Sequence, residues 1–544
     1  MATRSIFSRH RDLWIMGFLL ILSYSLFFYK SGDRYIWDPD EDEYALVNQE
    51  MVEDGHWIYP TANGVPYSIK PPLYNWLGSA ISLIGGEVTE ASSRLPSALF
   101  AAAGVLMTYL LGKLLFGYRA GLLAAMVLAT TPLYIEQGRW IQIHLPGTVF
   151  LTATILCFIW GYKNEQRRPL AYLLMYVPLA LGTLTTGPVA VVMPALIIGG
   201  YLLLTKDLWH IWRLRLGWGA LIYLAIAAPW FVTVSMKKEY AEVLLVTTNL
   251  TRYFQTFVHD HPFYYYVKRM PPWFLPWLLY LPGAIIAYFK HLTPEEKKAS
   301  LLPFLWGAGL LLFFSVSRTK REVYMITTAP ALALIVGANL DWAASRFETS
   351  LFWRRCFVWP TSLTLVLLTI GALGLPAYAW FRAPDWVTVV LPITIMGVIA
   401  MACAFRFLAK RQNLAVITAI VLLLAGVVAY GARNVIAKVN EARSPRAFCQ
   451  QINTIIPPDE DLRMFAFFRP AYGYYTHRRL ILLHDPSALK ALFTSGKRAY
   501  VVTKDEVYRS LKENFPVPVF VIYRQEVDGR DILLLSNQPD SKPS

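Results

Sequence analysis

Long apolar runs recur along most of the chain, separated by short polar stretches. A helix that crosses a bilayer needs roughly 20 mostly apolar residues, and about thirteen such segments precede a change of composition near Arg433. We expect these helices near residues 13–29, 96–116, 119–136, 142–162, 170–186, 188–205, 216–234, 273–289, 300–315, 325–340, 356–376, 387–408 and 413–431. The pattern predicts a polytopic α-helical membrane protein.

Charged residues between the apolar runs indicate how the helices are oriented. The first run follows Arg4, Arg9 and Arg11 and has no small-residue cleavage site after it, so we expect a retained anchor with a cytoplasmic amino end. Alternate loops from there on are rich in lysine and arginine, as the positive-inside rule requires. The basic group at residues 318–321 lies on the predicted outer side and breaks this rule, which indicates a local function.

The chain divides into two predicted domains. Residues 1–432 form the membrane domain, with long outer segments at 30–95 and 235–272, and loops of that length are usually functional or disordered. Because an odd number of helices precedes them, residues 433–544 are expected outside the cytoplasm. Alternating patterns such as Ala499–Thr503, mixed with helical pieces, predict a small extracytoplasmic α/β domain there.

Composition and charge exclude several classes of protein. The chain is 56% hydrophobic and only 16% charged. A soluble globular protein usually contains fewer hydrophobic and more charged residues, so the composition argues against that class. The net charge of +15 comes from short clusters between apolar runs, so we expect membrane lipids and no nucleic acid as partners. The four cysteines lie far apart and predict neither a disulfide framework nor a metal site.

The first outer segment carries five carboxylates within residues 38–43. One interpretation is a solvated acidic turn that caps the next helix. The other is a catalytic base, because a carboxylate beside a bilayer is partly desolvated and its pKa is raised. Lys70, just before Pro71 and Pro72, is either a snorkelling anchor or an ammonium held in a fixed direction.

The second outer segment contains Arg252 and then His259, Asp260 and His261. The two histidines suit zinc, but no third ligand is clustered with them, so we predict no metal. Arg252 and the basic group at 318–321 suit a phosphate or pyrophosphate on a lipid, since charge-assisted bonds hold such an anion. Pairing with the acidic run or with lipid headgroups is the alternative.

These motifs resemble those of the GT-C fold membrane glycosyltransferases, in the branch that holds protein O-mannosyltransferases and the lipid A aminoarabinose transferase. The run at residues 40–45 resembles that family's first acidic motif, residues 70–72 its lysine-proline-proline element, and residues 314–324 its late basic loop. The resemblance implies a GT-C fold with an outer α/β domain, in the bacterial cytoplasmic (inner) membrane.

The resemblance also implies the reaction, which is transfer of one sugar from a polyprenyl-phosphate donor to an extracytoplasmic lipid, glycan or protein, with inversion and without a nucleotide or other cofactor. Asp40 is then the catalytic carboxylate, with Glu41 beside it. The residues expected to contact the donor phosphate are Lys70, Arg252, Lys320, Arg321 and Tyr324. The residues expected to bind the acceptor or support the site are Tyr44, Arg139, His144 and His261.

Departures from the aminoarabinose transferase pattern leave the substrates open. Ile69 stands where that enzyme has glutamate, Thr186 replaces a lysine, and His144 stands where many relatives carry a second outer aspartate. The competing hypotheses are a flippase of lipid-linked sugars and a non-catalytic assembly protein. Transporters place polar sites near the midplane on broken helices, whereas here the polar groups collect in outer loops. The aromatic run at 469–475 fits a glycan-binding surface or a packed core strand.

Overall fold

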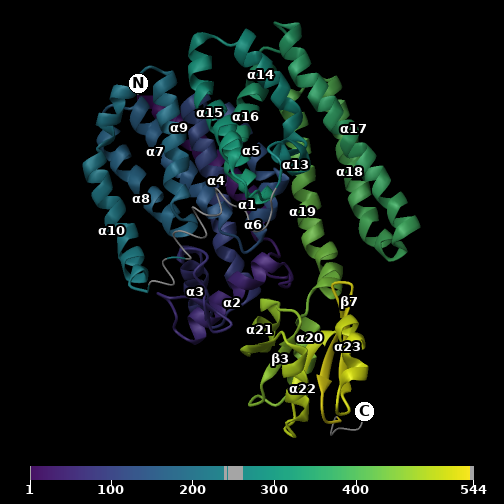
Figure 1. Cartoon of the computed structure of the whole chain (residues 1–544). Coiled ribbons are helices and arrows are strands. Elements are labelled where there is room, and N and C mark those ends of the chain that lie inside the picture. Colours follow the sequence, from purple (N-terminus) through teal and green to yellow (C-terminus); the bar gives the residue numbers. More distant parts are fainter. Residues whose placement is uncertain (1, 238–241, 243–260, 540–544) are drawn as a thin grey trace. The chain divides into compact units, whose positions relative to one another are not determined.

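The computed structural model describes residues 2–237, 242 and 261–539 (Figure 1). Arg252 and the His259-Asp260 pair lie outside the described residues. The chain forms two compact units. The first, here called the membrane unit, consists of Met1–Tyr29, Ser68–Tyr74 and Leu95–Gly431. The second, here called the outer unit, consists of Lys30–Tyr67, Asn75–Arg94 and Ala432–Ser544.

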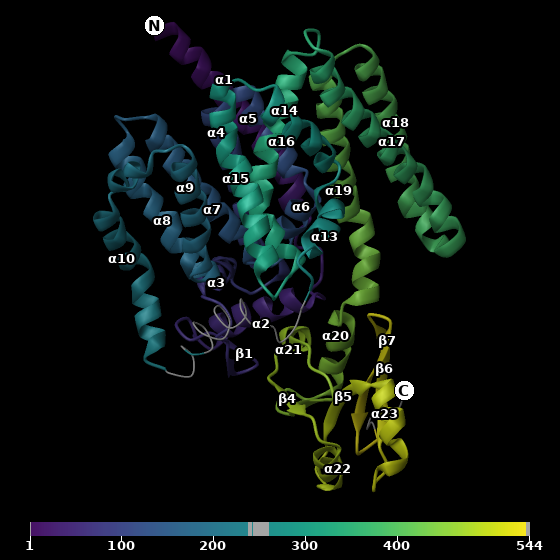
Figure 2. The same ribbon diagram turned by 45° about the horizontal axis from the view of Figure 1, so that its top comes forward.

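The membrane unit is built from helices, several of which contain proline. In chain order they are α1 (Ala2–Ser23), η1 (Tyr24–Phe28), α4 (Glu90–Phe116), α5 (Tyr118–Ala129), α6 (Pro132–Arg139), α7 (His144–Lys163), α8 (Arg168–Thr186), α9 (Val189–Leu204), η2 (Leu208–Leu214), α10 (Leu216–Ser235), α13 (Tyr265–Phe274), η4 (Trp277–Tyr280), α14 (Leu281–Lys290), α15 (Pro294–Val316), η5 (Glu322–Thr328), α16 (Ala329–Ser345), α17 (Leu351–Arg382), η6 (Pro384–Trp386), α18 (Val387–Ala409) and α19 (Asn413–Arg443). In both views α17 lies beside α18 as a helical hairpin (Figure 2).

Within the described residues, ten helices are long and apolar enough to cross a membrane. Two further segments are pairs of helices bent at a short break, and one apolar helix, α9, is shorter than a full span. Each predicted apolar segment therefore corresponds to one of these helices or bent pairs. The predicted polytopic helical fold is confirmed.

Two segments that were predicted as single helices are pairs of helices joined at a bend. The segment predicted at 119–136 breaks after α5 and turns by 63° into α6, which begins at Pro132. The segment predicted at 273–289 begins earlier, at Tyr265, and bends by 110° between α13 and the following helix. Proline lacks the N–H that would continue the helical hydrogen bonds, and hydropathy alone does not detect such a break.

Glycines allow the central helices of the membrane unit to pack closely. A Cβ atom added at Gly337 in α16 would lie 2.4 Å from the backbone nitrogen of Ala124 in α5. A Cβ atom added at Gly121 in α5 would lie 2.6 Å from the backbone oxygen of Tyr109 in α4. Small residues at such crossings let helix backbones approach in lipid, so α5 is enclosed by its neighbours.

The C-terminal part of the outer unit is a mixed five-stranded sheet flanked by helices. The strands are β3 (Leu462–Phe465), β4 (Leu480–Leu483), β5 (Tyr500–Lys504), β6 (Phe520–Val527) and β7 (Arg530–Ser536), and their order is β4-β3-β5-β7-β6. The helices are α20 (Arg446–Ile455), α21 (Pro470–Thr476), α22 (Pro486–Thr494), α23 (Asp505–Leu511) and η7 (Lys512–Asn514). β3 is parallel to β4 and β5, whereas β7 is antiparallel to β5 and β6. This is the predicted α/β domain.

The same unit contains most of the first outer segment. That segment forms α2 (Pro39–Glu53), β1 (Thr61–Ala62), β2 (Val65–Pro66) and α3 (Leu73–Gly85). We expected residues 30–95 to belong to the membrane domain, but residues 30–67 and 75–94 group with the chain after Gly431. The cause is direct contact, because α2 packs on α21.

The aromatic run at 469–475 is mostly the helix α21 and not a strand. Tyr472 and Tyr474 are buried, and an added Cβ on Gly473 would touch Leu46 of α2. Buried rings cannot stack on a sugar in solution, so these two tyrosines serve packing, and the glycan-surface interpretation does not hold for them.

Candidate active site

The acidic run divides into carboxylates with different partners. Asp38 is the N-cap residue of α2, and its Oδ1 accepts a hydrogen bond of 3.0 Å from the backbone N–H of Asp40. Pro39 follows at the first helical position, where proline is favoured. Burial raises the pKa of the Asp38 carboxyl above its ordinary value. The capping interpretation is therefore correct for Asp38.

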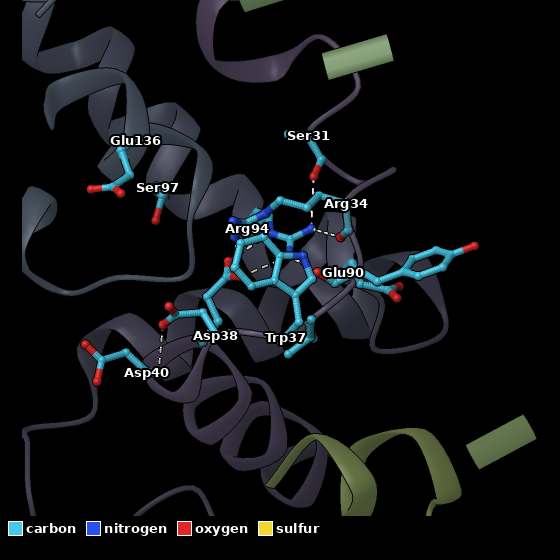
Figure 3. Close-up of polar contacts among 12 residues, drawn as sticks. Ser31, Arg34, Trp37, Asp38, Asp40, Glu90, Arg94, Ser97 and Glu136 are labelled. Carbon is cyan, nitrogen blue, oxygen red and sulfur yellow. Dashed lines mark hydrogen bonds and ion pairs between the residues drawn. The ribbon is translucent and has the colours of Figure 1, made fainter. Parts of the chain in front are cut away.

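Glu41 is fully buried and pairs with two guanidinium groups, those of Arg34 and Arg94, which are labelled in Figure 3. Its Oε1 lies 3.0 Å from Nε of Arg94, and Arg34 forms a second ion pair with it. Arg94 also donates hydrogen bonds to the backbone carbonyls of Ser31 and Tyr35, at 3.0 and 3.3 Å. This network fixes the start of α2 against residues 31–35, so Glu41 holds the backbone in place.

Sequence reasoning missed both arginines of this network. Burial lowers the pKa of Arg34 to about 10, although Glu41 opposes this change. Arg94 stands alone as a cation in the first turns of the apolar helix α4. A buried cation needs a charged partner. The lone arginine in an apolar helix was therefore the feature of the sequence that could have indicated a buried ion pair.

Asp42 is also buried, and it joins α2 to α21. Its Oδ2 lies 3.0 Å from Nε of Arg469, whose Nη2 donates a hydrogen bond of 2.6 Å to the carbonyl of Trp37. Burial raises the pKa of Asp42 to about 7, and the attraction of Arg469 works against this rise. Asp42 therefore belongs to the packing of the outer unit.

Asp40 differs from Glu41 and Asp42 because its side chain is only partly buried. Figure 3 shows it pointing away from Arg34 and Arg94. Tyr67, which sequence reasoning also missed, lies within electrostatic range of Asp40, and burial raises the pKa of its hydroxyl well above the ordinary value. Tyr67 also forms a hydrogen bond with Tyr44, and the two ring centroids are 6.2 Å apart. Tyr44 is thus a buried partner of Tyr67.

A cationic cluster forms within the membrane unit. His144, the first residue of α7, packs its ring edge to face against Tyr324 of η5, with centroids 5.4 Å apart. Lys70 and Arg321 both lie close enough to His144 to act on its charge. These side chains are all partly buried and come from three distant parts of the chain. Their meeting brings together four of the predicted site residues.

Lys320 has a different environment from the one expected. It is 4% exposed, and its ammonium donates hydrogen bonds to the backbone carbonyls of His261, at 2.9 Å, and Ser317. The ring of His261 stacks on Tyr265 at 4.2 Å between centroids. Lys320 and His261 therefore brace the loop that carries Arg321.

Arg139, the last residue of α6, also contacts backbone carbonyls. It donates to Leu26 and Tyr29, at 2.9 and 3.0 Å, where η1 ends. These carbonyls have no partner within the helix that they end, so Arg139 caps it. As for metals, the described residues contain no group of three or more His, Cys, Asp or Glu side chains that could hold an ion.

Comparison with known proteins agrees with this architecture. A family model described as dolichyl-phosphate-mannose-protein mannosyltransferase matches residues 69–232. The crystal structure of ArnT from Cupriavidus metallidurans bound to undecaprenyl phosphate superposes with a TM-score of 0.81 at 20% identity, covering 97% of this chain and 99% of that chain. These matches define a multi-pass membrane protein of the GT-C fold.

One named relative narrows the class further, and a second relative extends the similarity over most of the chain. An undecaprenyl phosphate-alpha-4-amino-4-deoxy-L-arabinose arabinosyl transferase of Proteus mirabilis is 24% identical over 72% of this chain and 71% of its own length. An uncharacterized protein of Aquifex aeolicus is 25% identical over 92% of this chain and 95% of its own length. The chain is a membrane glycosyltransferase of the GT-C fold, as the sequence predicted.

Proposed function

We propose that this protein transfers a single sugar from a polyprenyl-phosphate donor to an acceptor outside the bacterial cytoplasmic membrane. The observation that carries the proposal is the cluster of Lys70, His144, Arg321 and Tyr324 in a polytopic unit of the GT-C fold. A relative named for undecaprenyl phosphate-linked aminoarabinose and a structural neighbour bound to undecaprenyl phosphate support this donor class.

The cluster suits the phosphate of the donor. Lys70 offers an ammonium and Arg321 a planar guanidinium, and both form charge-assisted hydrogen bonds to phosphate oxygens. The Tyr324 hydroxyl and the His144 ring add neutral donors beside them. As the bond between the sugar and the phosphate breaks, negative charge grows on the phosphate, and these groups stabilise it. Lys320 contributes indirectly by holding the loop before Arg321.

Asp40 is the proposed catalytic carboxylate. A nucleophilic atom of the acceptor attacks the anomeric carbon of the sugar, the bond from that carbon to the phosphate oxygen breaks, and polyprenyl phosphate leaves. The proton of the acceptor passes to the Asp40 carboxylate. One displacement of this kind inverts the configuration at the anomeric carbon. Glu41, clamped by Arg34 and Arg94, acts as a positioning residue for the helix turn that carries Asp40.

The proposal includes an orientation and a range of acceptors. The positive-inside pattern supports a cytoplasmic amino terminus and an extracytoplasmic outer unit. The acceptor is a lipid such as lipid A, a glycan or a protein. The named relative is only 24% identical to this chain, so the substrates of this chain need not be those of the aminoarabinose transferases.

A transfer assay with the purified full-length protein tests the proposal. The protein in liposomes is given a panel of polyprenyl-phosphate sugars together with a membrane lipid extract, and the products are analysed by mass spectrometry. The expected result is a new glycoside and an equal amount of free polyprenyl phosphate. Intact donor that has merely crossed the liposome bilayer would instead identify a flippase.

A further inference from the structure

The connection between α9 and α10 has two unlike sides. It consists of the 3-10 helix η2 and its flanking residues. On the inner side His210 and Leu214 are buried, at 3% and 7% exposure. On the outer side Trp209 and Trp212 are 78% and 71% exposed. Such large apolar side chains in a loop between helices require an explanation.

Hydrogen bonds hold the inner side of η2 on the helices beneath it. The Tyr172 hydroxyl lies 2.6 Å from Nε2 of His210, and the Tyr176 hydroxyl donates to the carbonyl of Leu214 at 3.0 Å. Both tyrosines belong to α8. Because these bonds fix the rotation of η2, the two tryptophans are presented outward by the fold itself.

The outer side combines aromatic rings with cations. The rings of Trp209 and Trp212 meet edge to face, with centroids 6.4 Å apart, and Lys206, Arg213 and Arg215 are exposed around them. Trp218, at the start of α10, extends the exposed aromatic surface. The acidic residue of this stretch, Asp207, accepts a hydrogen bond from Tyr162, which turns it toward the bundle.

We propose that this surface, residues 206–218, binds the anionic phospholipid headgroups of the cytoplasmic leaflet. Tryptophan is enriched at the level of the headgroups, where one part of the ring is in an apolar and another in a wet environment. Lysine and arginine beside it attract anionic lipids. The positive-inside rule places this basic loop on the cytoplasmic side. A protein-binding patch would instead be depleted of lysine at its centre.

Native mass spectrometry of the full-length protein in detergent tests the proposal. The protein is titrated with phosphatidylglycerol or with phosphatidylcholine, and the number of retained lipids is counted. The test variant is Arg213→Gln with Arg215→Gln. The matched control, Lys298→Gln with Arg355→Gln, removes two exposed cations near the starts of α15 and α17, which are predicted to lie on the same side of the membrane.

The wild type is expected to retain phosphatidylglycerol in preference to phosphatidylcholine. The test variant is expected to bind phosphatidylglycerol about tenfold more weakly, since each cation near an anionic surface contributes severalfold, whereas the control changes less than about twofold. Equal weakening by both variants, or equal retention of the two lipids by the wild type, would overturn the proposal.

A second pair of measurements keeps the test independent of how the arginine variant folds. In the wild type, added salt is expected to reduce retention of phosphatidylglycerol more than that of phosphatidylcholine. Trp209→Ser with Trp212→Ser is expected to weaken retention while the surface charge stays constant. Salt-independent retention that also survives loss of both tryptophans contradicts a headgroup site, and it would direct attention to a protein partner.

Discussion

At the scale of single residues, the acidic run shows how neighbouring carboxylates acquire different roles. Asp38 caps a helix, Glu41 and Asp42 are buried in ion pairs, and Asp40 and Glu43 are partly exposed. Removing a buried ion-pair partner leaves an uncompensated charge and costs about 3–5 kcal/mol. A loss of activity in a Glu41 or Asp42 variant is therefore no evidence for a catalytic role of that residue unless the stability of the variant is measured as well.

The phosphate-binding hypothesis predicts a change in donor affinity. Lys70→Gln or Arg321→Gln is expected to raise KM for the polyprenyl-phosphate donor by roughly 10- to 100-fold, because a hydrogen bond to a charged group contributes about 1.5–3 kcal/mol. Arg318→Gln is the matched control, since Arg318 is an exposed cation of the same loop. Steady-state kinetics with varied donor decide the matter, and unchanged KM in both test variants would contradict the assignment.

The buried Asp42 predicts a pH dependence of stability. Its pKa is raised from 3.8 to about 7 in the folded protein, so between these values the folded state binds more protons than the unfolded state. The stability of the wild type relative to Asp42→Asn should therefore fall as pH rises from 4 to 7, by at most about 1.4 kcal/mol per pH unit, and then level off. Thermal unfolding from pH 4 to 8 measures this difference, and a pH-independent difference would refute the effect.

At the scale of elements, the close crossing of α5 and α16 depends on the absence of a side chain. Gly337→Ala is expected to destabilise the protein by about 1–3 kcal/mol, because the added methyl group would force apart two backbones. Gly309→Ala in α15 is the control, because an added Cβ there meets nothing within 4 Å. Thermal unfolding in detergent compares the two. Equal melting temperatures would show that the crossing tolerates the extra volume.

The helices were predictable because a chain in lipid must satisfy its backbone hydrogen bonds internally. The segments expected at 216–234 and 387–408 accordingly agree with α10 and α18 to within a residue or two. The bends were not predictable from hydropathy, since both sides of the break before Pro132 are apolar. Local sequence also carries no signal for the packing of α2 on α21, whose residues are hundreds of positions apart.

Part of the candidate site was also predictable from the sequence. Asp40 and Lys70 stand in motifs that the sequence displays directly. The carbonyl partners of Lys320 depend on how residues 261 and 317 approach each other, and the Arg94 partner of Glu41 lies 53 positions away. Contacts of this kind are set by tertiary structure, so the sequence identified these residue types without their roles.

At the scale of the whole molecule, the chain crosses from one unit to the other several times. The first outer segment is held to the C-terminal domain by reciprocal hydrogen bonds between Asn63 and Leu480, at 2.9 and 2.7 Å, and by an ion pair between Arg479 and Asp54. Because Asp40 stands on α2 of that segment, the C-terminal domain supports the turn that carries the proposed base.

The orientation predicts which surfaces reagents can reach. Single cysteines at Lys497 in the outer unit and at Lys298 at the start of α15, both exposed, are introduced after the four native cysteines are replaced by serine. A membrane-impermeant maleimide applied to bacterial cells with a permeabilised outer membrane is expected to label Lys497→Cys only. Lys298→Cys should react after the inner membrane is opened, and the reverse pattern would show the opposite orientation.

The most direct test of the central claim compares two carboxylates of the same helix. Single-turnover transfer is measured for Asp40→Asn and Glu43→Gln, both of which remove a partly buried carboxylate with little change of volume, and unfolding temperatures are measured alongside. The account predicts that Asp40→Asn slows transfer by about 10²- to 10⁴-fold with an unchanged unfolding temperature, whereas Glu43→Gln keeps most of the rate. Full turnover by Asp40→Asn would contradict the account.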